Sequence, residues 1–220
     1  MQPPRGVAAF DFDGTLVRGD SLPRFLARLL GRRRFTTVLV RSGPSMLGGY
    51  IRSGRDGSKS ALLAKAVGGV PAEQAVATGE AFAQVLAEQV RPDMARSMAW
   101  HRSRDHERIL VSASLAIYLE PFGRLSGFDR VIATRLEVGE DGRLTGRIEG
   151  PNVRAAQKAF RLSEAIGSDP VEMWAYGDSV GDREMLAMAD HPVWAGARRN
   201  ARGFSADAKV VHRPECADGS

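Results

Sequence analysis

The chain has 220 residues, of which 43% are hydrophobic and 26% charged, and its formal net charge is +5. This length is enough for one globular core, or for a core with a small accessory module. No apolar stretch approaches the roughly 18–20 residues of a membrane-spanning helix, so we expect no membrane insertion. The first residues are too few and too polar for a secretory signal, and the single cysteine, Cys216, cannot form an internal disulfide, so we expect a cytoplasmic protein.

The positive charge is most simply explained by arginine-rich solvated faces, and it would also suit a small anionic substrate. The densest basic run, Arg32 to Arg34, is short and has no interleaved aromatic residues, so we expect no nucleic-acid partner. A basic, helical surface that meets a membrane surface is an alternative that nothing in the sequence requires. The oligomeric state is left open.

Apolar runs predict the strands of a parallel sheet. Helical patterns separate several of them, and Asn152 is a candidate N-cap of the helix before the fourth strand. This alternation predicts an α/β fold, a Rossmann-like parallel sheet with helices on both faces. The predicted strands are residues 7–12, 109–111, 131–133 and 173–176, with weaker runs at 193–195 and 209–211, and the helices are residues 92–104, 152–165 and 183–189.

Two segments depart from the alternation. Glu140-Asp141-Gly142 lies between two alternating stretches, residues 135–138 and 143–148, and predicts an antiparallel hairpin. Between the first two strands, helical patterns predict a small helical cap over residues 18–91, with helices at 21–30, 58–67 and 71–90. The core would then comprise residues 1–17 and 92–213, and residues 214–220 would form a tail.

The first polar cluster is Asp11-Phe12-Asp13-Gly14-Thr15, directly after the first strand. A turn at Gly14 would aim both carboxylates at one pocket. One carboxylate can attack phosphorus, and the other can protonate the leaving oxygen and deprotonate water. Two charges this close favour a cation between them, and Mg²⁺ prefers oxygen ligands. An Asp-Gly turn with only a capping role is the alternative.

A second acidic cluster, Asp178 and Asp182, follows the fourth strand. Its spacing suits a metal and a bound water, or a helix cap followed by a first-turn acid. Ser112 follows the second strand, where a hydroxyl and main-chain N–H groups bind phosphate oxygens well. Lys158, on a predicted helix, would neutralise a phosphate. Taken singly, Ser112 could equally be a loop serine without a function, and Lys158 could be a solvent-exposed helix lysine.

The order of these features resembles the four motifs of the haloacid dehalogenase superfamily, over residues 7–211. The helical insertion, the hairpin and Gly150-Pro151-Asn152 resemble its phosphoserine-phosphatase-like branch, subfamily IB, which carries a small helical C1-type cap. The resemblance implies a phosphatase. Dehalogenating members lack the second acid, here Asp13, and the pumps of the superfamily carry transmembrane helices.

The resemblance also implies roles for the site residues. Asp11 would be the nucleophile and a metal ligand, and Asp13 the general acid and base, with its carbonyl on Mg²⁺. Asp178 would complete the protein ligands. Asp182 would hold a metal-bound water or Lys158. Ser112 and Lys158 would bind the transferring phosphoryl group.

The substrate is less well defined. Asp20 and Lys59 fall near the glutamate and arginine with which phosphoserine phosphatases bind their substrate, but lysine cannot form the bidentate contact of arginine. The double glycine typical after the second-motif serine is Ala113-Ser114 here. These departures favour another small phosphomonoester over phosphoserine. Asp20 as an N-cap and Lys59 as an exposed lysine are the alternatives. A phosphotransferase and a phosphate-binding regulatory module remain as alternative functions.

Overall fold

The structure, a computed structural model, describes residues 4–38, 40–41 and 62–196. One six-stranded sheet runs through it in the order β4-β3-β2-β1-β5-β6. All neighbouring strands are parallel except the β3–β4 hairpin. The strands are β1 (Arg5–Phe10), β2 (Glu107–Leu115), β3 (Arg130–Val138), β4 (Leu144–Glu149), β5 (Val171–Gly177) and β6 (His191–Trp194).

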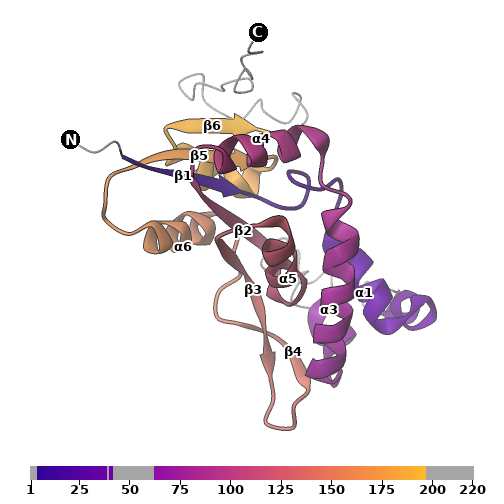
Figure 1. Ribbon diagram of the computed structural model, residues 1–220. Helices are drawn as coiled ribbons and strands as arrows, with labels where there is room; N and C mark the ends of the chain where they lie inside the picture. The colour runs from indigo at the N-terminus through magenta and orange to yellow at the C-terminus, as the bar shows by residue number, and fades with distance from the viewer. Residues whose placement is uncertain (1–3, 39, 42–61, 197–220) are drawn as a thin grey trace.

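Helices cover both faces of this sheet (Figure 1). Alternate residues of β1 face opposite sides: Phe10 packs into the core with α3 and α5, whereas Val7 and Ala9 pack with α6 and α7. The predicted α/β class is therefore confirmed. The helices are α1 (Ser21–Leu30), α3 (Ala72–Ala87), α4 (Pro92–Arg102), α5 (Ala116–Ser126), α6 (Ala156–Ile166) and α7 (Arg183–Ala187), with a 3-10 turn η1 (Val180–Asp182) before α7.

The described residues between β1 and β2 are mainly helical. Besides α1, α3 and α4, residues 32–38, 40–41 and 62–67 are helical. Figure 1 shows α3 alongside α5, with α1 beyond it. A Cβ at Gly79 of α3 would lie 2.2 Å from the carbonyl oxygen of Ile117, so this close approach requires glycine. Within the described part of the chain, no helix is long and apolar enough to cross a membrane.

The second strand extends further than its apolar run predicts. β2 continues through Ser112 to Leu115, so Ser112 lies within a strand rather than after it. The polar residues find partners there: the Ser114 N–H donates to Ser112 Oγ at 3.1 Å, and Thr134 Oγ1 donates to the Ala113 carbonyl at 3.0 Å. The polar groups at the end of β2 are therefore hydrogen-bonded inside the fold.

Other boundaries also differ from the prediction. The strand predicted at 131–133 and the first hairpin strand are one element, β3. Helix α6 begins at Ala156 with Ala155, not Asn152, as its N-cap residue, and the Asn152 side chain lies 2.8 Å from Thr134 Oγ1 instead. Pro71 precedes α3 as its N-cap residue. The weak run at 193–195 overlaps β6, whereas the runs at 209–211 and 214–220 lie outside the described residues.

Candidate active site

The carboxyl ends of three neighbouring strands bring the predicted site residues to one edge of the sheet. Asp11 follows β1, and its N–H donates to the Tyr176 carbonyl of β5 at 2.9 Å. Asp178 follows β5, and Ser112 is the sixth of the nine residues of β2. In open α/β sheets, ligands bind at this edge.

Asp11 is held in a buried ion pair. Its side chain is 7% exposed, and Lys158 Nζ from α6 contacts its Oδ1, while Thr15 Oγ1 donates to its Oδ2 at 3.1 Å. Lys158 also donates to Asp182 Oδ1 at 2.5 Å. Burial opposes the charge of Lys158, yet the carboxylates of Asp11 and Asp182 raise its pKa. The lysine is therefore a fixed positive charge between two acids, and the alternative of a solvated helix lysine is wrong.

Asp182 is built into the turn that follows β5. Its Oδ2 accepts from the N–H of Asp178 at 3.3 Å and from the N–H and hydroxyl of Ser179 at 3.0 and 2.7 Å. Ser179, not Asp178, is the N-cap of this turn and forms a capping box with Asp182. Both oxygens of Asp182 thus have protein donors, and the residue positions Lys158 and the Asp178 main chain.

The acidic groups suit a hard divalent cation. Asp11, Asp178 and Asp182 offer oxygens that lie within 4.8 Å of one another. Burial raises the pKa of Asp11 to about 7 and that of Asp178 to about 6, and the Asp182 charge adds to both effects. One lysine faces three carboxylates, so the cluster lacks positive charge. An all-oxygen donor set of this kind fits Mg²⁺. Asp11 and Asp182 both accept hydrogen bonds from protein groups on each of their oxygens.

The Asp13 carboxylate turns to a different set of partners. It accepts from the Ser21 N–H at 2.8 Å, from Ser21 Oγ at 3.0 Å and from Ser114 Oγ. Burial raises its pKa. Gly14 permits this separation, because its φ is +83° and a Cβ there would lie 2.1 Å from Asp178 Oδ2. Neither serine was predicted from the sequence, although a serine in place of the second glycine was a signal at position 114.

Arg91, just before α4, is a further group that was not predicted from the sequence. Its guanidinium donates to the carbonyls of Gly14 at 2.9 Å and Ala195 at 3.0 Å, and it pairs with Asp93 at 2.8 Å. Arg91 thereby joins the turn after β1 to the segment after β6. Nothing in its local sequence marked it, because both carbonyls come from distant parts of the chain.

The two candidate substrate residues have different outcomes. Asp20 is the N-cap of α1, and its Oδ1 accepts from the Leu22 N–H at 3.0 Å, as its capping alternative predicted. Lys59 lies outside the described residues.

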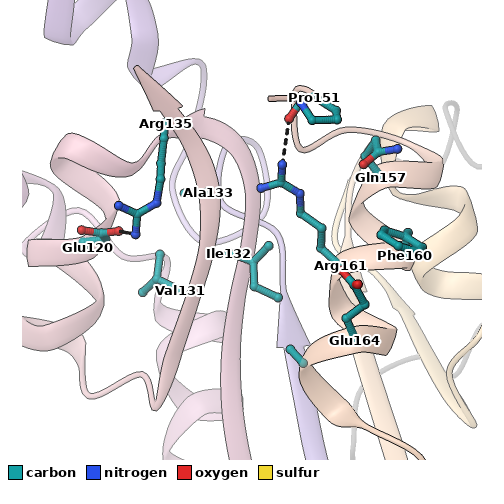
Figure 2. Close-up of a pocket in the computed structure, with 11 residues that line it drawn as sticks. Glu120, Val131, Ile132, Ala133, Arg135, Pro151, Gln157, Phe160, Arg161 and Glu164 are labelled. Atoms are coloured by element: carbon teal, nitrogen blue, oxygen red, sulfur yellow. Dashed lines mark hydrogen bonds and ion pairs between the residues drawn. The ribbon is translucent and has the colours of Figure 1, made fainter. Parts of the chain in front are cut away.

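An open groove lies away from these acids, between β3 and α6 (Figure 2). It encloses about 620 Å³, and the exposed ring of Phe160 stands at its edge. Its walls carry two arginines, Arg135, which pairs with Glu120 at 2.5 Å, and Arg161, which donates to the Pro151 carbonyl at 3.2 Å. The described residues that line it do not include the predicted site residues.

Known proteins that resemble this chain include a sequence family, curated relatives and solved structures. A sequence model of haloacid dehalogenase-like hydrolases matches residues 8–187. Protein CicA of Caulobacter vibrioides is 37% identical over 185 residues, 84% of this chain and 83% of that protein. Phosphoserine phosphatase of Halobacterium salinarum is 29% identical over 83% of this chain and 82% of its own length. A crystal structure of a Bordetella pertussis protein described as of unknown function superposes with a TM-score of 0.73 at 26% identity, over 91% of this chain and 96% of that one.

Proposed function

Because this chain belongs to the haloacid dehalogenase-like hydrolase family and is a phosphatase, we propose that it hydrolyses a small phosphate monoester with Mg²⁺, through an aspartyl-phosphate on Asp11. The observation that carries the proposal is the buried Asp11 carboxylate, which is paired with Lys158 and lies beside Asp178. A non-catalytic binding module would not need a carboxylate oriented in this way.

In the first step, an oxygen of Asp11 attacks phosphorus as the bond from phosphorus to the ester oxygen breaks. Lys158 donates to one oxygen of the Asp11 carboxylate and Thr15 to the other, so the attacking atom is oriented before substrate arrives. Asp13 gives its proton to the departing oxygen. In the second step, Asp13 takes a proton from water, and the resulting hydroxide attacks phosphorus, which releases phosphate and restores Asp11.

The phosphoryl oxygens would be bound by Lys158 and Ser112. Asp182 Oδ1 holds the lysine at 2.5 Å and thereby keeps the ammonium group beside Asp11. Ser112 Oγ accepts from the Ser114 N–H at 3.1 Å, which leaves its own hydroxyl proton free to be donated to a phosphoryl oxygen. Phosphoryl transfer depends mainly on such positioning and charge neutralisation.

Asp11 and Asp178 are the side chains that would hold Mg²⁺, and the Asp13 carbonyl is the third protein ligand that the family resemblance assigns. When bound, the cation would neutralise charge on the phosphoryl group and hold it against Asp11. The excess of carboxylates over cations around Lys158 supports this assignment.

The division into domains is part of the proposal: a core of residues 1–17 and 92–213, a helical cap of residues 18–91 and a tail of residues 214–220. The ends of the proposed cap lie side by side, since the Arg91 N–H donates to the Leu16 carbonyl at 2.8 Å. A segment that leaves and re-enters the core at adjacent points suits an inserted unit. The cytoplasmic location stays a prediction.

Phosphate release from a panel of phosphomonoesters, phosphoserine included, tests the proposal. The wild-type chain and Asp11→Asn are each assayed with Mg²⁺ and with EDTA. We expect turnover that needs the metal and falls more than about a thousandfold in the variant, as is usual for loss of a nucleophile. An added alcohol acceptor that takes the phosphoryl group would favour a phosphotransferase. Folded protein that releases no phosphate from any ester would contradict general hydrolysis.

A further inference from the structure

A buried hydroxyl cluster beside Asp13 draws its residues from α1, β2 and α5. It consists of Ser21, Ser114 and Tyr118, which are at most 6% exposed. Ser21 Oγ lies 2.9 Å from the Tyr118 hydroxyl and 3.3 Å from Ser114 Oγ. None of the three belongs to the four motifs found in the sequence.

The direction of the hydrogen bonds follows from counting protons. The hydroxyls of Ser21 and Ser114 both donate to Asp13 Oδ2. A serine has one hydroxyl proton, so Ser21 must accept from Tyr118, whose proton therefore points toward the cluster. The Ser21 N–H donates to Asp13 Oδ1 at 2.8 Å. All these bonds converge on one carboxylate.

This arrangement leaves one acceptor position on Asp13. A carboxylate offers about four acceptor sites, two on each oxygen. The described donors fill both sites on Oδ2 and one on Oδ1, so the second site on Oδ1 is left for a proton that is to be transferred. Three bonds from two elements also fix the plane of the carboxyl group, so this site keeps one direction.

We propose that Ser21, Ser114 and Tyr118 are positioning residues that orient Asp13 so that its Oδ1 exchanges the proton with the leaving oxygen and with water. The inference rests on the proposed function, in which Asp13 is the general acid and base. The proton passes from Oδ1 to the ester oxygen as the bond from that oxygen to phosphorus breaks, and Oδ1 regains a proton from the attacking water. Ser114 gives the simplest test of the three, because its hydroxyl is its only bond to Asp13. Ser21 also bonds to Asp13 through its N–H, and Tyr118 bonds to Ser21.

At Ser114 the two hydrogen bonds can be separated by substitution. Its N–H donates to Ser112 Oγ, and its hydroxyl donates to Asp13 Oδ2. Ser114→Ala removes only the hydroxyl, so the phosphate-binding serine keeps its main-chain donor. Ser21→Ala and Tyr118→Phe remove the other two hydroxyls. Matched controls are Ser97→Ala, a buried serine that donates to the Asp93 carbonyl, and Tyr176→Phe, a buried tyrosine whose hydroxyl meets His101.

The experiment compares kcat/KM of the full chain with Mg²⁺ on three esters: 4-nitrophenyl phosphate, phenyl phosphate and the best alkyl phosphate of the panel. A nitrophenolate leaves without a proton, whereas an alkoxide needs one. Because general acid catalysis contributes about 10²–10⁴-fold, we expect Ser114→Ala to lose about 10- to 100-fold on the alkyl ester and less than about threefold on 4-nitrophenyl phosphate. Ser21→Ala should show the same selectivity, Tyr118→Phe a weaker one, and Ser114→Thr, which keeps the hydroxyl, should restore the alkyl rate.

The outcomes separate this inference from the proposed function. Equal losses on all three esters, or no loss, in both serine variants would overturn the positioning role, provided that Asp13→Asn is itself selective for alkyl esters. If Asp13→Asn slows all esters equally, the acid role of Asp13 fails and this inference fails with it. If Ser114→Ala does not fold, Ser21→Ala and Tyr118→Phe decide the outcome against their controls.

Discussion

Two polar clusters lie near the end of strand β5, one at Tyr176 within it and one at Asp178 just after it, and they differ in charge. Tyr176 points to a neutral cluster, in which its hydroxyl lies 2.9 Å from His101 Nε2 and His101 Nδ1 lies 2.9 Å from His106 Nδ1. Two residues later, Asp178 joins a charged cluster with Asp11, Asp182 and Lys158. In the neutral cluster, each of these ring nitrogens and the hydroxyl has a protein partner. The charged cluster has three carboxylates and one lysine.

The difference separates a structural cluster from a functional one. Burial, together with the nearby His106, lowers the pKa of His101 to about 3, and burial raises that of Tyr176 to about 12, so both stay uncharged near neutral pH. Phe10 stacks on Tyr176 with ring centroids 4.3 Å apart, which closes this cluster. The charged cluster stays short of positive charge, and it is therefore the one suited to receive a cation and a phosphate.

The largest expected effect comes from Lys158, the only described cation that bonds to both Asp11 and Asp182. Lys158→Met would leave two buried carboxylates unpaired, which costs about 3–5 kcal/mol of unfolding free energy. We expect this loss in urea unfolding without metal, a smaller loss with Mg²⁺, and no measurable phosphate release in either case. Lys158→Arg, which keeps the charge, is the control. A metal-free Lys158→Met variant as stable as wild type would show that the cluster needs no internal cation.

The pH dependence of stability tests whether the cluster around His101 is neutral. The pKa of His101 is about 3 in the fold, against about 6.5 in an unfolded chain. Below pH 6.5 the unfolded chain therefore binds a proton that the fold excludes, so the unfolding free energy falls as the pH falls, by at most about 1.4 kcal/mol per pH unit.

Urea unfolding at pH 7 and pH 5 measures this effect. In His101→Gln, the difference between the two pH values should shrink relative to wild type. His191→Gln, at a half-buried histidine, serves as the control variant. Identical differences in wild type and His101→Gln would mean that His101 does not carry the effect.

The smallest effect concerns Asp20, an exposed carboxylate that belongs to neither cluster. Its cap on α1 predicts a loss of about 1 kcal/mol in Asp20→Ala and almost none in Asp20→Asn, since asparagine caps equally well. Thermal unfolding measures both. The same variants test the phosphoserine alternative: a rise in KM for phosphoserine alone in Asp20→Asn would show that the charge binds substrate.

Local pattern was sufficient for much of this protein. Apolar runs and turn residues predicted the parallel sheet and the β3–β4 hairpin, and α1 has its predicted bounds. They also placed Asp11 and Asp178 at strand ends, because the carboxyl ends of parallel strands share one edge. The extension of β2 through Ser112 was missed, since its apolar run ends at Val111 and Thr134, which bonds to the Ala113 carbonyl, lies elsewhere in the chain.

The sequence by itself determined the fold class and the order of the acids, because periodicity and motif spacing are properties of neighbouring residues. Only the tertiary structure decided how the two motif carboxylates differ. Asp11 meets Lys158 from 147 residues away, whereas Asp13 meets Ser114 from 101 residues away. Partners so distant are chosen by how helices pack on the sheet, and packing follows from the shape of the whole core, which no local pattern contains.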